Sequence, residues 1–104
     1  EASALRACLA AGQPVVFGFR VFASFESDAV ARTGVVPMPG ADEALLGGHA
    51  VVAVGYDADR FVVRNSWGSA WGDDGYCTMP VEYVTDPMLA GDLWVLETVT
   101  ATSV

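Results

Sequence analysis

Two apolar runs separated by a short polar turn constrain the fold of this chain more than any other feature. The runs cover residues 49–56 and 60–65, and Asp57-Ala58-Asp59 lies between them. β-Branched and aromatic residues are common in the runs and aspartate favours tight turns, so the pattern predicts an antiparallel β-hairpin. The first run is apolar on both faces of a strand, which predicts a central position in a sheet.

The position of the turn predicts which residues of the hairpin face one another. A turn on Asp57 and Ala58 places His49, the one histidine of the chain, opposite residue 65, 66 or 67. Cross-strand neighbours have Cβ atoms about 4.5–5.5 Å apart, so the imidazole should reach the amide oxygen of Asn65. Such a bond fixes the imidazole tautomer and leaves the other ring nitrogen free for proton transfer. A histidine satisfied by a polar neighbour in a purely structural role is the alternative interpretation.

The remaining segments predict one N-terminal helix and further strands. The helix is expected from an N-cap at Ser3 to about Ala11, with Gly12 ending it. Beyond it we expect a strand at 15–22, irregular structure or one short helix at 24–33, a loop or edge strand at 34–40, a glycine-rich loop at 67–75, a strand at 76–79, a short helix at 80–84 and a strand at 92–99. The predicted fold class is therefore α+β, with one N-terminal helix and an antiparallel sheet of five or six strands that curls toward a barrel.

Composition excludes several classes of protein. A chain of 104 residues forms one domain at most, and a hydrophobic content of 53% excludes disorder. The longest apolar runs, such as 50–54, are far shorter than the roughly 20 residues of a membrane-spanning helix. The net charge of −8 disfavours nucleic acid as a partner, because phosphate is also negatively charged.

The cysteines do not predict a metal site. Cys8 and Cys77 are the two cysteines, and no C-x-x-C or H-x-x-x-H motif accompanies them. A zinc site requires about four ligands, usually in close pairs, so we expect no metal and no other cofactor. Each cysteine is expected to be a buried, inert thiol, and a disulfide between the two is the alternative.

A segment rich in tryptophan and glycine follows the hairpin directly. Residues 65–76 have the pattern N-S-W-G-x-x-W-G-x-x-G-Y, in which glycine follows both Trp67 and Trp71. Glycine allows a loop to adopt positive φ angles and to approach its neighbours closely. An indole beside a His–Asn contact excludes water and strengthens that hydrogen bond. The segment therefore favours an oriented imidazole over a structural histidine.

Together these motifs resemble the C-terminal half of the catalytic domain of papain-like cysteine peptidases. The matching segments are 13–15 (Q-P-V), 48–51 (G-H-A-V), 54–56 (V-G-Y), 65–68 (N-S-W-G), 71–72 (W-G) and 75–76 (G-Y). The resemblance implies that residues 1–104 form the C-terminal subdomain of the papain-like fold. It also implies that His49 is the general acid and base and that Asn65 orients its imidazole. Trp67 would shield their hydrogen bond, and Trp71 would line the leaving-group side of the cleft.

The resemblance further implies where a peptide or protein substrate would lie. Gly18, Gly48 and Ala50 would border the pocket for the second substrate residue before the cleaved bond. All three are small, so a roomy pocket is expected. Members of the family are commonly secreted, periplasmic or vacuolar.

Neither cysteine matches the nucleophile of that family. The nucleophile stands in a C-G-S-C-W-like motif at a helix start, roughly 130–150 residues before the histidine and asparagine. Cys8 lies within the predicted helix and only 41 residues before His49, and Cys77 follows both His49 and Asn65. We therefore expect this chain to supply the His/Asn half of a peptidase site, to be inactive alone, and to need an N-terminal half that bears the cysteine. Without that half, the exposed active-site face is expected to self-associate. The alternatives are a non-catalytic papain-derived binding module and a structural fragment.

Overall fold

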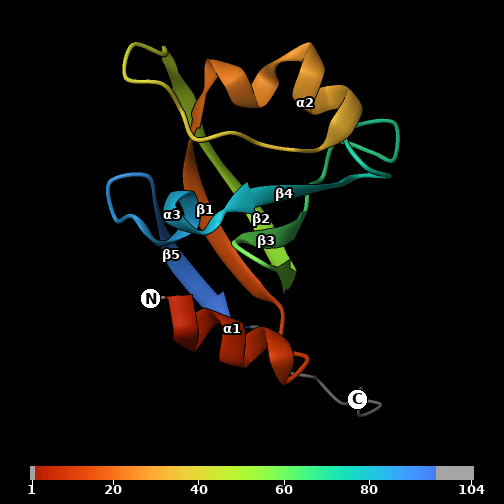
Figure 1. Ribbon diagram of the computed structural model, residues 1–104, viewed down its shortest axis with the longest axis vertical. Helices are drawn as coiled ribbons and strands as arrows, with labels where there is room; N and C mark the ends of the chain where they lie inside the picture. Colours follow the sequence, from red (N-terminus) through yellow and green to blue (C-terminus); the bar gives the residue numbers. More distant parts are fainter. Residues whose placement is uncertain (1, 96–104) are drawn as a thin grey trace, which may run out of the picture.

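The computed structural model describes residues 2–95 of the chain. Its elements are, in order, α1 (Ala2–Ala10), β1 (Val15–Phe22), the 3-10 helix η1 (Ala23–Glu26), α2 (Asp28–Thr33), β2 (Leu45–Asp57), β3 (Arg60–Arg64), β4 (Tyr76–Pro80), α3 (Val81–Thr85) and β5 (Ala90–Val95). Helix α1 lies at one end of the long β1–β2 pair, and α2 lies at the other end (Figure 1). Within this range no helix has the length and apolar character that crossing a membrane requires.

The strands form one antiparallel sheet in the order β4-β3-β2-β1-β5. Strand β2 is central, as its apolar character on both faces predicts. The α+β class, the antiparallel sheet and the N-terminal helix are confirmed. The sheet is open, because β4 and β5 are its edges in the described residues. An isolated parallel bridge joins Val35 to Thr78 at the outer edge of β4. The 34–40 segment is therefore a loop that pairs with the edge of the sheet at one residue.

Several boundaries differ from the predicted ones for local physical reasons. Helix α1 already includes Ala2, so Ser3 lies inside the helix and not at the position before its first residue. Strand β2 begins earlier than predicted because β1 continues to pair with it as far as Phe22 opposite Leu45. Two adjacent glycines, Gly47 and Gly48, conceal this extension in the sequence, since glycine usually indicates a turn.

The 24–33 segment forms two helical elements where a single short helix or irregular structure was expected. Ser27 separates them, and its Oγ accepts a hydrogen bond from the Val30 N–H at 3.2 Å, which caps α2. The predicted strand at 92–99 begins at Ala90 instead, and its residues 96–99 lie outside the described range.

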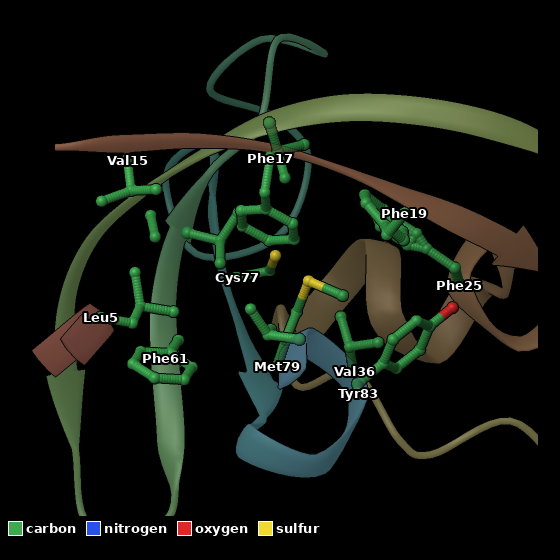
Figure 2. Packing of buried hydrophobic residues seen from close by; sticks show 14 of the residues in the cluster. Leu5, Val15, Phe17, Phe19, Phe25, Val36, Phe61, Cys77, Met79 and Tyr83 are labelled. Carbon is green, nitrogen blue, oxygen red and sulfur yellow. The ribbon is translucent and has the colours of Figure 1, made fainter. Parts of the chain in front are cut away.

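One hydrophobic cluster fills the space between the inner face of the sheet and the helices (Figure 2). Alternate residues of β1, including Phe17 and Phe19, point into it. Tyr83 of α3 is 1% exposed and donates its hydroxyl proton to the Arg20 carbonyl at 2.5 Å. Burial raises the pKa of Tyr83 to about 12, and the negative charge of Glu43 adds to this effect.

Close backbone contacts fix the loop between β3 and β4 against the end of α2. The Gly72 N–H donates to the Ala31 carbonyl at 2.7 Å. A Cβ on Gly72 would lie 2.5 Å from the Tyr76 carbonyl oxygen, and a Cβ on Gly34 would lie 2.7 Å from the same oxygen. Both glycines have positive φ, so no other residue fits either position without displacing the backbone.

Gly72→Ala should therefore destabilise the protein more than Gly68→Ala, a matched change in the same loop. The φ angles are 63° and 87°, so each alanine costs about 1–2 kcal/mol in backbone strain. At Gly72 the new methyl group also collides with Tyr76, whereas at Gly68 nothing lies within 4 Å. Urea unfolding of the two variants measures the difference, and equal losses would contradict the close packing.

Candidate functional site

The β2–β3 hairpin brings the two predicted catalytic side chains together. Its turn is Ala58-Asp59, because Asp57 pairs with Arg60, and Ala58 has a φ of 52°. The predicted turn, on Asp57 and Ala58, is therefore one residue too early, and counting from the observed turn alone would place His49 opposite residue 68. An irregularity between Ala53 and Gly55 shifts the pairing back by one residue, so that Val52 pairs with Arg64, within the predicted register.

Asn65 is the first residue after β3, and its side chain reaches His49 on β2. The His49 Nε2 and Asn65 Oδ1 atoms lie 2.7 Å apart, so the predicted contact is confirmed.

The contacts of the Asn65 amide decide which atom donates in this bond. Its Oδ1 also accepts the backbone N–H of Ser66 at 2.8 Å. A backbone N–H can only donate, so the atom that it contacts must be the amide oxygen. The His49 Nε2 must then carry the shared proton. Neutral His49 therefore has its lone pair on Nδ1, which is the nitrogen that can accept a proton from another group.

An aromatic cluster surrounds this pair. The Trp67 ring stacks on the imidazole of His49, with centroids 5.1 Å apart and planes at 22°. Trp71 meets Trp67 edge-on at 5.4 Å and so supports it from the side. Asn65 is only 6% exposed, whereas Trp67 is 41% exposed. One face of the indole therefore lies against the imidazole of His49, while the Trp67 side chain as a whole still reaches the surface.

Two phenylalanines that the sequence did not single out complete the cluster. Phe25 of η1 lies 5.4 Å from Trp67, 5.5 Å from Trp71 and 6.4 Å from His49 between ring centroids. Phe19 of β1 lies 5.9 Å from His49. Phe19 is the cross-strand partner of His49, but η1, α2 and a loop separate β1 from β2, so no turn in the sequence fixes this pairing. Phe25 stands in an irregular segment, where no local pattern indicates its role.

An open groove of about 320 Å³ lies beside His49. Gly18 and Gly48, two of the predicted substrate-binding residues, line it. Ala50 pairs with Gly18 and is exposed, but it lies outside the lining. The connection from α3 to β5 and the start of β5 supply a wall that the sequence did not predict. Pro87 and Leu89 come from the connection, and Ala90, Gly91 and Asp92 come from β5.

The two cysteines are free and lie in different surroundings. Cys77 on β4 is 2% exposed, and burial raises its pKa to about 12, although the positive charge of Arg60 opposes the rise. Cys8 on α1 is half-buried, so it is less enclosed than the expected inert thiol. Neither thiol is hydrogen-bonded to His49 in the described range, and nowhere in that range do three or more His, Cys, Asp or Glu side chains gather as metal ligands would.

Comparison with known proteins gives the family. Residues 1–87 match the papain family of cysteine proteases. This chain belongs to that family. The resemblance seen in its motifs is thereby confirmed, together with the papain-like fold.

Relatives of the chain include viral, insect and bacterial proteins. The uncharacterized peptidase C1-like protein L477 of Acanthamoeba polyphaga mimivirus is 50% identical over 98 residues, which are 92% of this chain and 32% of that protein. A cathepsin L-like peptidase of Aedes aegypti is 39% identical over 76% of this chain and 24% of its own length. The crystal structure of xylellain, a cysteine protease from Xylella fastidiosa, is similar with a TM-score of 0.87 and 45% identity, over 96% of this chain and 38% of xylellain. This chain thus spans about a third of the mimivirus relative.

The His49 tautomer can be tested directly by NMR. At a pH where the ring is neutral, long-range ¹H–¹⁵N spectra of labelled protein should show the proton on Nε2 and a bare Nδ1. Asn65→Ala removes the acceptor, so the two tautomers should then become mixed. A proton found on Nδ1 in the unmodified protein would contradict the assigned amide orientation.

The thiols should differ sharply in reactivity. In the native protein at pH 8, an aromatic disulfide reagent should modify Cys8 and leave Cys77 unmodified until urea unfolds the chain, because only a thiolate at the surface reacts. Release of the chromophore counts the modified thiols. Cys8→Ser is the matched control and should abolish labelling of the native protein. Rapid labelling of that variant would show that Cys77 is accessible.

Proposed function

We propose that this chain supplies the histidine and asparagine half of a cysteine-peptidase active site that hydrolyses peptide bonds. The 2.7 Å bond between His49 Nε2 and Asn65 Oδ1, in the tautomer that frees Nδ1, carries the proposal. In this reaction Nδ1 takes the proton of a cysteine thiol, and the thiolate attacks the peptide carbonyl. The imidazolium then gives that proton to the departing amine, and water hydrolyses the remaining thioester.

The other residues of the site have supporting roles in this proposal. Asn65 holds the imidazole, and Trp67 keeps water away from their bond. Trp71 lies near the leaving-group side and buttresses Trp67 at 5.4 Å. Gly18, Gly48 and Ala50 border the position of the second substrate residue before the cleaved bond. Their lack of bulk leaves the groove beside His49 open to a peptide or protein substrate.

We infer that the nucleophile belongs to a segment outside these 104 residues. The buried Cys77 has a pKa of about 12, so it is not ionised near neutrality. Cys8 stands on α1, at the end of the β1–β2 pair away from α2 (Figure 1). The His49 ring instead contacts Phe25 of η1, which immediately precedes α2. On this proposal residues 1–104 are the C-terminal half of the peptidase domain and are inactive alone.

The partner in this proposal is an N-terminal half that carries the cysteine and covers the face around His49. Trp67 on that face is 41% exposed. An exposed apolar patch at the rim of a groove marks a surface that another chain or a ligand covers. The chain alone should therefore self-associate through this surface, which light scattering at increasing concentration would detect.

A chimera tests the proposed function. The segment of xylellain that this chain matches is replaced by residues 1–104, and two activities are measured: hydrolysis of peptide substrates, and labelling of an activated catalytic cysteine by an active-site-directed peptidase inhibitor. We expect both activities in the chimera and neither in the 104-residue chain alone. Hydrolysis by purified 104-residue chain would show that the nucleophile lies within it. A folded chimera that neither cleaves peptides nor reacts with the inhibitor would favour a non-catalytic module.

His49→Ala in the chimera should lower kcat by about 10²–10⁴-fold, the usual contribution of a general acid and base. Asp59→Ala, in the exposed hairpin turn, is the matched control and should leave kcat unchanged. A His49→Ala chimera with the activity of the parent would remove the basis of the proposal.

A further inference from the structure

A carboxylate remote from His49 holds the helical turn that carries Phe25. Glu43 lies in the connection between α2 and β2, and its Oε1 accepts the Ser24 N–H at 2.7 Å. Its Oε2 accepts the Gly40 N–H at 2.6 Å. The residue before η1, Phe22, provides no side-chain cap. Glu43 therefore satisfies an amide at the start of η1 that has no local acceptor.

Both bonds are of the strong, charge-assisted type. The backbone N–H groups of Gly40 and Ser24 point at the carboxylate and lower the pKa of Glu43, so the side chain is ionised at neutral pH. A carboxylate that accepts backbone N–H groups binds about twice as strongly as a neutral acceptor. The link also joins positions 19 residues apart, so it ties η1 to the distant loop.

Ser24 and Phe25 are neighbours in η1, and Phe25 is the centre of the aromatic cluster. Phe25 is 1% exposed. It meets Phe19 edge-on at 5.0 Å and also contacts Trp67, Trp71 and His49. A displacement of the Ser24 amide would move Phe25, and the stacked rings of Trp67 and His49 would lose their contacts with the Phe25 ring.

We propose that Glu43 is a positioning residue that, through Ser24 and Phe25, sets how closely Trp67 covers the hydrogen bond between His49 and Asn65. This role deepens the proposed function, since it would tune the imidazole of a peptidase. Glu43 acts without touching His49: its contacts in residues 2–95 are with the Ser24 and Gly40 segments and, through its charge, with Tyr83. Tyr83 itself packs against Phe19 at 5.8 Å, so the carboxylate lies beside a second support of the cluster.

Exchange of the His49 Nε2 proton with water, measured by NMR, reports this cover. Glu43→Gln removes the charge and one acceptor oxygen, and its new N–H₂ group faces a backbone N–H. We expect exchange about tenfold faster than in the unmodified protein, because a tenfold shift in an opening equilibrium corresponds to about the stability that one charge-assisted hydrogen bond contributes. Asp42→Asn is the matched control, since Asp42 is an exposed neighbour and no hydrogen bond of its side chain is found within residues 2–95. Exchange that is unchanged in Glu43→Gln, or equally fast in Asp42→Asn, would overturn the proposal.

A double-mutant cycle tests whether the effect passes through Phe25. Phe25→Leu should speed exchange by itself, and adding Glu43→Gln should speed it no further. Independent sites would instead multiply the two effects, and that result would overturn the route through Phe25.

Amide exchange in the unmodified protein keeps the proposal testable should a variant fail to fold. The Ser24 and Gly40 amides should be protected from exchange, and rapid exchange of either would contradict their capture by Glu43. None of these readouts requires peptidase activity. If the chimera is inactive but Glu43→Gln speeds exchange of the Nε2 proton, the proposed function is refuted and the positioning role of Glu43 stands. If the chimera is active but Glu43→Gln leaves that exchange unchanged, the proposed function stands and the positioning role is refuted.

Discussion

Antiparallel pairing along β2 holds the parts of the site in their places. This strand is paired on both sides, with Phe19 of β1 opposite His49 and with β3 leading directly into Asn65. A shift of one residue in either register would turn a side chain to the other face of the sheet. The imidazole would then lose the amide oxygen or the phenylalanine beneath it. The 2.7 Å contact between His49 Nε2 and Asn65 Oδ1 thus depends on the strand pairing that places the two side chains on one face.

A glycine of the β3–β4 loop fixes the position of the loop that carries Trp67 and Trp71. Gly72 approaches both the Ala31 carbonyl and the Tyr76 carbonyl, which packs the loop onto α2. With the loop anchored there, Trp71 can support Trp67, and Trp67 can stack on the imidazole. The spacing of tryptophan and glycine in the sequence is therefore a packing requirement of this loop.

Local sequence patterns predicted the parts of the fold and site that depend on local interactions. Strand β1 and the hairpin follow from runs of β-branched and aromatic residues, and the contact of His49 with Asn65 follows from counting around a tight turn. Phe25, Glu43 and the groove wall near Gly91 could not be predicted in this way. Each acquires its role from a partner distant in sequence, as Glu43 does from Ser24. The early start of β2 was missed for the same reason, because only pairing with β1 makes a strand of a segment that contains two glycines.

The burial of Cys77 and Tyr83 has a consequence for the alkaline limit of the fold. Their pKa values rise from 9.0 and 10.0 to about 12 when the chain folds, so the folded protein holds two protons that the unfolded chain would release. Their contribution to stability is complete below pH 9 and is lost as the pH rises toward 12. The folded state is thus destabilised in strong base, because ionisation of Cys77 and Tyr83 would place two negative charges among apolar side chains.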